Sequence, residues 1–229
     1  NGAMNLIDAC IDRKVKKVVA LSTDKASSPI NLYGATKLAS DKLFVASNSY
    51  SNEHASRFSV VRYGNVMGSR GSVIPFFISQ KDKGSLPITD DRMTRFMITL
   101  EEGVELVWHA FDDMVGGETY VKKIPSMKVS DLALTIAPDA KQEIIGIRPG
   151  EKLHEQMISE EDSYYTYEYP NHYKILPVIN NWGLSTERIK DGKKVVEGFS
   201  YTSNNNSEWM SVETLANWIK INKKKIGNF

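Results

Sequence analysis

Two short apolar runs rich in β-branched residues constrain the fold more than any other feature of this chain. The first is Val18-Val19-Ala20-Leu21 and the second is Phe58-Ser59-Val60-Val61. Short runs of this kind, alternating with segments of helical periodicity, are typical of parallel strands that helices cover on both faces. The pattern therefore predicts an α/β protein built on a doubly wound, Rossmann-type parallel sheet.

Polar residues follow the first run directly. Residues 22–25, Ser-Thr-Asp-Lys, come at the carboxyl end of the predicted strand, where open α/β sheets present groups to ligands. Pro29 breaks the chain, and Asn31 is placed to cap a helix that continues to Leu43. A hydroxyl, a carboxyl and an amine therefore reach the edge of the sheet just before a helix begins.

Tyr33 and Lys37 lie four residues apart on that helix, so their side chains leave the same face. A cation held beside a phenol favours the phenolate, which makes a tyrosine a usable base near neutral pH. On an amphipathic helix this spacing alone is common and usually has no catalytic meaning. It becomes a catalytic hypothesis here because Thr23, Asp24 and Lys25 come just before it from a different element.

These residues resemble the catalytic set of the extended short-chain dehydrogenases/reductases, in which a Ser or Thr at a strand end acts with a Tyr-x-x-x-Lys helix. More narrowly, residues 22–26 and 31–37 resemble the inverting UDP-N-acetylglucosamine 4,6-dehydratases that open pseudaminic acid biosynthesis in bacteria. Related dehydratases carry Met in place of Tyr33, and glucose-type dehydratases have Asp-Glu in place of Asp24-Lys25. The likeness continues along most of the chain, through residues 62–77, 86–90, 92–96 and 146–155.

The resemblance implies a role for each residue of the catalytic set. Tyr33, assisted by Lys37, would take the proton of the sugar C4 hydroxyl while hydride leaves C4, with Thr23 hydrogen-bonded to the same oxygen. Lys25 would then remove the C5 proton, and Asp24 would protonate the C6 hydroxyl that leaves as water. Hydride returns to C6, and reprotonation of C5 on the opposite face gives a 4-keto-6-deoxy sugar of the L-arabino series.

The resemblance also implies the ligands and the residues that hold them. The cofactor is NADP, tightly bound and regenerated in each turnover, and its expected contacts are Ser22, Tyr33, Lys37, Tyr63, Gly64, Asn65 and Val66. The substrate is UDP-N-acetylglucosamine, and its expected contacts are Asn65, Ser69, Arg70, Arg95, Arg148 and Glu151.

Two segments support these assignments by their own chemistry. The turn over residues 64–72 combines glycines, which let the backbone approach a ligand, with side-chain donors. A strand is predicted over residues 144–147, and a helix is predicted to start within residues 148–152. Arg148 lies between the two, which suits the binding of a diphosphate. The His154-Glu155 pair lacks a histidine at position 158, so the metalloprotease pattern fails and we predict no metal site.

The chain is expected to contribute to two domains. Residues 1–66 and 97–124 would be the remaining part of the NADP-binding Rossmann domain, and residues 67–96 and 125–229 the smaller α/β domain that binds the sugar nucleotide. A Rossmann fold opens with a strand and a glycine-rich turn, of which residues 68–71 are an incomplete match. We therefore interpret the chain as the carboxyl-terminal portion of a longer protein, inactive alone; a natural truncation or a domain with another role are the alternatives.

The composition of the chain narrows the classes of molecule that it is expected to bind. The chain has 229 residues, 41% of them hydrophobic and 25% charged, and a formal net charge of +1, which is typical of a soluble globular protein with no general affinity for nucleic acid. No apolar stretch reaches the length of a membrane span. The single cysteine, Cys10, excludes an intrachain disulfide and fits a reducing compartment. We expect a cytoplasmic homo-oligomer, which the resemblance implies is a hexamer.

Three functions stay open on the sequence alone. The first is the inverting dehydratase, a lyase at the first step of pseudaminic acid biosynthesis and hence of flagellin glycosylation. The second is a sugar-nucleotide epimerase of the same superfamily. The third is a cofactor-free module that binds sugar nucleotides or takes part in assembly. Loss of water from the substrate separates the first from the second, and binding of UDP without turnover supports the third.

Overall fold

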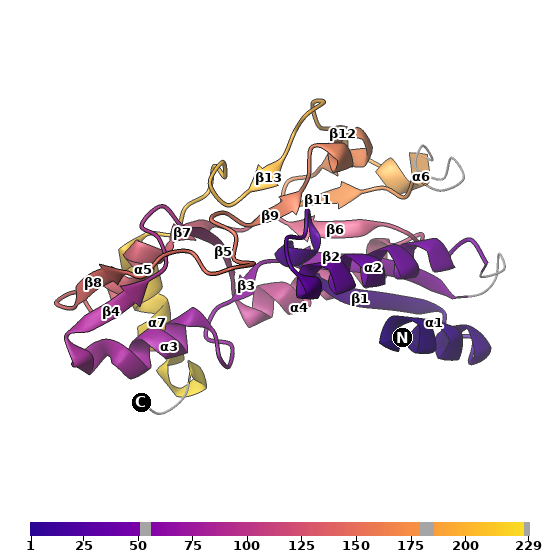
Figure 1. Ribbon diagram of the computed structural model, residues 1–229. Helices are drawn as coiled ribbons and strands as arrows, with labels where there is room; N and C mark the ends of the chain where they lie inside the picture. Colours follow the sequence, from indigo (N-terminus) through magenta and orange to yellow (C-terminus); the bar gives the residue numbers. More distant parts are fainter. Residues whose placement is uncertain (51–55, 179–185, 227–229) are drawn as a thin grey trace. The chain divides into compact units, whose positions relative to one another are not determined.

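The computed structural model describes residues 1–50, 56–178 and 186–226, and the chain divides into two compact units (Figure 1). Unit 1 comprises Asn1–Tyr63, Glu101–Lys123 and Gln156–Tyr201. Unit 2 comprises Gly64–Leu100, Ile124–Glu155 and Thr202–Phe229. Among the described residues, no helix has both the length and the apolar character that crossing a membrane requires.

Unit 1 is built on a six-stranded sheet in the order β1-β2-β6-β11-β10-β12. Its first three strands run parallel to one another, namely β1 (Lys17–Thr23), β2 (Arg57–Tyr63) and β6 (Thr119–Lys122). The other three continue the sheet with antiparallel pairings, namely β11 (His172–Ile175), β10 (Thr166–Glu168) and β12 (Lys193–Lys194). The predicted Rossmann-type α/β fold class is confirmed, with an antiparallel extension that the sequence did not indicate.

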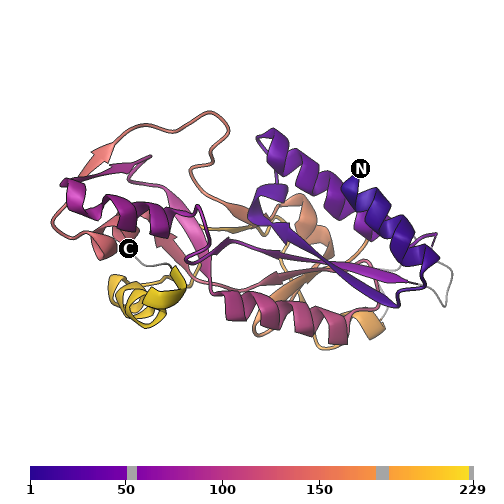
Figure 2. The same cartoon turned by 90° about the horizontal axis from the view of Figure 1, so that it is seen from below.

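Helices cover both faces of this sheet because successive strand residues point to opposite sides. Phe58 and Val60 pack with Ile7 of α1 (Gly2–Asp12) and Phe44 of α2 (Leu32–Ser47). Val61 points the other way and packs against α4 (Leu100–Asp113). Figure 2 shows the indigo and violet helices α1 and α2 on one side of the sheet and the magenta α4 on the other. The apolar run of β2 is therefore buried on both faces, as predicted.

Shorter elements complete unit 1. They are η1 (Asp24–Ala26), β9 (Gln156–Ile158), η3 (Glu161–Tyr165) and α6 (Thr186–Ile189). A two-residue strand, β13 (Tyr201–Thr202), pairs with β9.

Unit 2 has two small sheets and three helices around one core. The sheets are β3-β5-β7, from Asn65–Val66, Thr94–Ile98 and Ser126–Lys128, and β4-β8, from Ser85–Ile88 and Lys141–Ile144. The helices are α3 (Val73–Gln80), α5 (Val129–Ile136) and α7 (Val212–Ile226), with the short η2 (Lys81–Lys83) after α3. The core includes Phe77, Leu86, Leu132 and Leu215.

Three expectations about the second half of the chain were wrong in detail. Residues 156–201 belong to unit 1, not to the smaller domain, because β11 pairs with β6 and carries β10 and β12 with it. The strand predicted over residues 144–147 is Lys141–Ile144, which pairs in parallel with β4. No helix begins after Gly150, where the Glu151 N–H closes a turn by donating to the Arg148 carbonyl. The functions expected of the two units stay predictions.

A histidine pair lies on unit 1, where α4 meets β11. The Nε2 atoms of His109 and His172 are 3.3 Å apart, and the His172 ring stacks on Tyr169 at a centroid distance of 4.5 Å. Burial lowers the pKa of His172 to about 4, and the nearby charges of His109 and Lys174 act in the same direction. Asp113 opposes this shift but is itself ion-paired with Lys174. The fold therefore holds His172 neutral.

We expect His172 to make the chain less stable as the pH falls from about 6.5 to about 4. In this window the unfolded state binds a proton that the folded state refuses, so acid favours unfolding, and stability is complete above the unfolded pKa. Urea unfolding at pH 7.5 and pH 5.0 measures the effect. His172→Gln should reduce the loss between these pH values by up to about 2 kcal/mol. An equal loss in parent and variant would contradict the assignment.

Candidate active site

Three polar side chains meet at the end of β1. The Thr23 hydroxyl donates to Asp24 Oδ1 at 3.0 Å, and Lys25 Nζ donates to the same oxygen at 3.0 Å. Asp24 is fully buried, whereas the Lys25 side chain is 35% exposed. The other carboxylate oxygen, Asp24 Oδ2, is buried and accepts no hydrogen bond from the described residues. Because a buried acceptor without a donor is costly, a hydrogen-bond donor from a ligand would stabilise the site.

The helix α2 packs its first turn against this strand end. Asn31 Oδ1 caps the helix by accepting from the Gly34 N–H at 2.8 Å, as the sequence predicted. A Cβ atom at position 34 would lie 2.3 Å from the Lys25 carbonyl oxygen and 2.9 Å from Pro29 Cβ. Only glycine at position 34 therefore allows the helix to approach residues 23–25 this closely.

Replacing Gly34 with alanine is expected to lower the free energy of unfolding by about 1–3 kcal/mol. Alanine favours a helix by about 1 kcal/mol relative to glycine. Its Cβ, however, would collide with the Lys25 backbone carbonyl, which cannot move aside as the end of a flexible side chain could. Gly2→Ala is the matched control, since no atom lies within 4 Å of a Cβ at that helical position. Chemical denaturation of both variants tests this prediction. A Gly34→Ala chain as stable as the parent would show that the helix can shift without cost.

The face of α2 that carries Lys37 is turned toward β1. Lys37 Nζ donates to the Leu21 carbonyl at 2.7 Å, two residues before Thr23. Tyr33 lies one turn earlier on the same face and is 56% exposed. Within unit 1, the structure thus brings the tyrosine helix to the strand end that carries Thr23, Asp24 and Lys25, while the catalytic roles of these residues stay predictions.

A buried network that the sequence analysis missed lies beneath this strand end. The Ser22 hydroxyl donates to Asp41 Oδ2 at 2.6 Å, and Arg62 Nη2 lies 3.4 Å from the same oxygen. Arg62 Nη1 also donates to the Met157 carbonyl at 2.6 Å. Desolvation raises the pKa of Asp41, although Arg62 and Ser22 act to lower it. The Ser22 hydroxyl was expected to contact the cofactor, but its hydrogen is donated to Asp41 within unit 1.

A signal for this network was present in the sequence. Arg62 follows the apolar pair Val60-Val61 in a strand predicted to be buried, and Asp41 follows Lys37 by four residues, on the same helix face. Strand pairing places Arg62 opposite Ser22 in the β1–β2 register. A buried arginine needs an acceptor, which the helix that crosses these strands supplies.

The residues expected to bind the substrate lie in unit 2. Arg95 is buried and donates to three carbonyls, those of Thr94 at 2.7 Å, Lys152 at 3.0 Å and Leu153 at 3.2 Å. Its guanidinium therefore fixes residues 152–153, which favours a positioning role over direct contact with a phosphate. Arg148, in the same segment, is exposed. The Glu151 carboxylate accepts weakly from the Arg148 N–H at 3.4 Å.

The remaining predicted contacts follow β2. Burial raises the pKa of Tyr63, which is the last residue of β2. A Cβ at Gly64 would lie 2.5 Å from Phe96 Cβ, so the close approach of β5 is enough to require glycine there. Asn65 and Val66 form β3 and are half-buried, and the turn after them exposes Ser69 and Arg70. Among the described residues, no cluster of three or more His, Cys, Asp or Glu side chains is arranged to hold a metal ion.

Comparison with known proteins decides the family. The profile of a family described as polysaccharide biosynthesis protein matches residues 1–177, more than half of the chain. The chain belongs to this family. The chain is 56% identical over 223 residues to the UDP-N-acetylglucosamine 4,6-dehydratase (inverting) of Campylobacter jejuni. The match covers 94% of this chain and 66% of that protein. This similarity confirms the resemblance that the motifs around Thr23 and Tyr33 indicated.

Other relatives of this chain differ in their named activity. It is 39% identical over 209 residues to the UDP-glucose 4-epimerase of Rickettsia massiliae, covering 89% of this chain and 61% of that protein. The chain thus spans about two thirds or less of the length of these relatives.

Solved structures confirm the fold. The structure of Pen from Bacillus thuringiensis is 34% identical and matches 99% of this chain and 68% of its own, with a TM-score of 0.85. The NAD-dependent NDP-hexosamine 5,6-dehydratase TunA matches 65% of this chain and 56% of its own with a TM-score of 0.57, at 19% identity. At that identity the likeness to TunA shows a shared fold alone.

Proposed function

We propose that the protein to which this chain belongs is a UDP-N-acetylglucosamine 4,6-dehydratase that inverts C5. The observation that carries the proposal is the cluster of Thr23, Asp24 and Lys25 at the end of β1, with the helix of Tyr33 and Lys37 packed against it. The 56% identity to the inverting dehydratase of Campylobacter jejuni supports the choice of substrate.

In the first step Tyr33 takes the proton of the C4 hydroxyl, and Thr23 hydrogen-bonds the same oxygen. A nicotinamide cofactor, which we propose is NADP, would supply the chemistry of accepting hydride from C4 and returning it at C6. The exposed Tyr33 ring, beside a Lys37 ammonium anchored on the strand, leaves room for such a ligand at this edge. The C4 ketone then acidifies the hydrogen on C5.

Lys25 and Asp24 carry out the elimination of water. Transfer of one proton along their 3.0 Å hydrogen bond converts an ammonium and a carboxylate into an amine and a carboxylic acid. The amine removes the C5 proton and the acid protonates the departing C6 hydroxyl, so the ion pair is restored as water leaves. Protonation of C5 on the opposite face inverts that centre.

The product of this sequence is UDP-2-acetamido-2,6-dideoxy-β-L-arabino-hex-4-ulose, which would enter pseudaminic acid biosynthesis. We assign Arg148 to the diphosphate and Glu151 to the ribose, with Asn65, Ser69 and Arg70 at the sugar nucleotide. Arg95 supports them by fixing the segment before His154. The proposed enzyme is a cytoplasmic homo-oligomer.

The second candidate is a sugar-nucleotide epimerase, which the 39% identity to the Rickettsia massiliae epimerase favours. Epimerisation needs the tyrosine and the cofactor but no base for C5 and no acid for C6. The hydrogen-bonded Lys25 and Asp24 supply both, and for this reason we prefer the dehydratase.

Incubation with UDP-N-acetylglucosamine in heavy water tests the proposal, with the complete protein encoded by the reading frame that contains these 229 residues. The expected product lacks one water and carries one deuterium, at C5 and not at C6, by mass spectrometry and NMR. A C4 epimer with no loss of water would assign the epimerase activity. Binding of UDP without any turnover would instead assign the protein as a module that binds sugar nucleotides.

A further inference from the structure

A groove in unit 2 lies apart from all the residues assigned above. It is formed by α3 with η2, α5 and α7, and has a volume of about 280 Å³. Its floor is aliphatic, with Ile78, Ile136 and Ile219 partly buried against the core of the unit and Ile226 buried in it. The groove therefore leaves part of the core open to a ligand.

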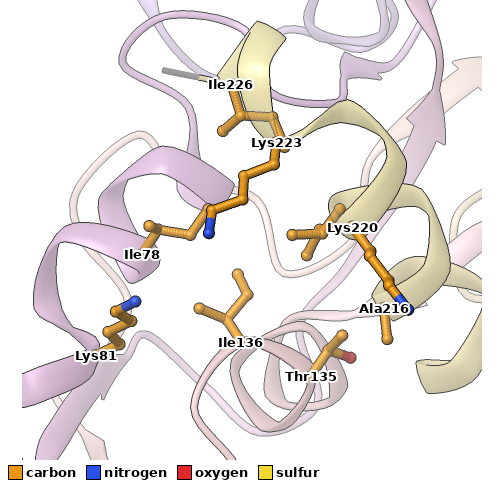
Figure 3. A pocket seen from close by; sticks show the side chains of 9 residues that line it. Ile78, Lys81, Thr135, Ile136, Ala216, Lys220, Lys223 and Ile226 are labelled. Atoms are coloured by element: carbon orange, nitrogen blue, oxygen red, sulfur yellow. The ribbon is translucent and has the colours of Figure 1, made fainter. Parts of the chain in front are cut away.

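The rim of the groove carries positive charge. Lys81, Lys220 and Lys223 line it, and no described residue contributes a carboxylate to the lining. Figure 3 shows Lys81 and Lys223 reaching from two sides toward the space above Ile78 and Ile136. Like charges collected around an apolar floor favour a ligand that is both anionic and apolar.

The lining also excludes other ligands. Among the described residues, the lining contains no aromatic ring on which a sugar or a nucleobase could stack, and its Thr135 hydroxyl already donates to the Asp131 carbonyl at 2.8 Å. Ammonium groups repel a metal ion. The volume is at the lower end for small-molecule sites, and nine lining residues are fewer than the 20–30 a side of a stable protein interface.

We propose that this groove binds a single-chain amphipathic anion, an aliphatic chain that ends in a carboxylate. The aliphatic chain of the ligand lies on the isoleucine floor, and its carboxylate lies between the ammonium groups of Lys81 and Lys223. Burial of the chain supplies the driving force, and the two lysines select an anionic head over a neutral one.

Methyl NMR of the complete protein that contains these 229 residues, with labelled isoleucine, tests this proposal, with sodium decanoate as the probe. We expect saturable shifts of the methyl signals of Ile78, Ile136 and Ile226. Acetate, which has the head without the chain, should cause no shifts at the same concentration. Decanol, which has the chain without the charge, should bind about tenfold more weakly.

Matched variants locate the charge effect. Lys81→Gln and Lys223→Gln should each weaken decanoate binding about 3- to 10-fold, whereas Lys83→Gln, an exposed lysine of η2 outside the groove, should not. Ala216→Glu, at an exposed position of the lining, should weaken binding by adding a negative charge. All four changes are at exposed positions, and the remaining methyl signals report whether the fold is kept. Absence of saturable shifts, equal affinity for decanol, or indifference to Lys81→Gln and Lys223→Gln would each overturn the proposal.

Discussion

Replacing Lys25 with methionine is expected to lower the kcat of the complete protein by about 10²- to 10⁴-fold. The variant loses the amine that we propose removes the C5 proton but keeps Tyr33, Lys37 and Thr23, so oxidation at C4 should persist. Reduced cofactor should therefore accumulate on the enzyme during a single turnover, without exchange of the C5 hydrogen with solvent. Absorbance of the reduced nicotinamide and deuterium content at C5 measure the two steps separately.

Lys42→Met is the matched control for this variant, since Lys42 is an exposed lysine on the same unit and makes no contact with Asp24. It should keep the parent kcat. Lys25 is not the base if Lys25→Met retains more than about a tenth of the parent kcat, or if C5 exchange continues at the parent rate.

Replacing Arg62 with methionine should destabilise the chain by about 3–5 kcal/mol, the largest loss expected from any single change discussed here. Methionine fills much of the same volume, but it leaves the buried carboxylate of Asp41 without its cation and the Met157 carbonyl without its donor. Asp41 and Met157 are both almost completely buried, so water cannot replace the contacts that Arg62 made with them. Urea unfolding of parent and variant at pH 7 measures the difference.

Arg92→Met shows whether burial decides the size of this effect. Arg92 pairs with Asp90 at 2.8 Å, closer than the 3.4 Å between Arg62 and Asp41, yet 68% of the Arg92 side chain is exposed. A pair with an exposed cation contributes little, because water solvates the guanidinium, and the backbone N–H of residue 92 still donates to Asp90 Oδ1 after the change. Arg92→Met should therefore leave the urea midpoint nearly unchanged. Equal losses in the two variants would contradict the role assigned to the buried network.

The features that could be predicted from the sequence depend on neighbours along the chain. The strand that ends at Thr23, the cap at Asn31 and the common face of Tyr33 and Lys37 all follow from spacings within one or two turns. Each of these signals involves side chains that act on their own backbone or on the next turn, so no tertiary contact is needed to read them.

The features that could not be predicted depend on distant partners. Arg95 is committed to carbonyls 57 and 58 residues away, so its occupied guanidinium leaves no trace in the local sequence. The strands β10, β11 and β12 are two to four residues long, and they join the sheet because β11 pairs with β6, β10 with β11 and β12 with β10. Ile145 and Ile147 were expected in a strand, but the pairing of β8 with β4 ends at Ile144 and leaves both exposed.

A crystal structure of the complete protein with UDP-N-acetylglucosamine would decide whether the residues at the end of β1 act on the sugar, because it places the hexose ring relative to them. We expect Tyr33 Oη and Thr23 Oγ1 within hydrogen-bond distance of the C4 oxygen, about 2.6–3.2 Å, with Lys25 Nζ facing C5. A hexose bound away from the end of β1, or one whose C5 is out of reach of Lys25, would contradict it.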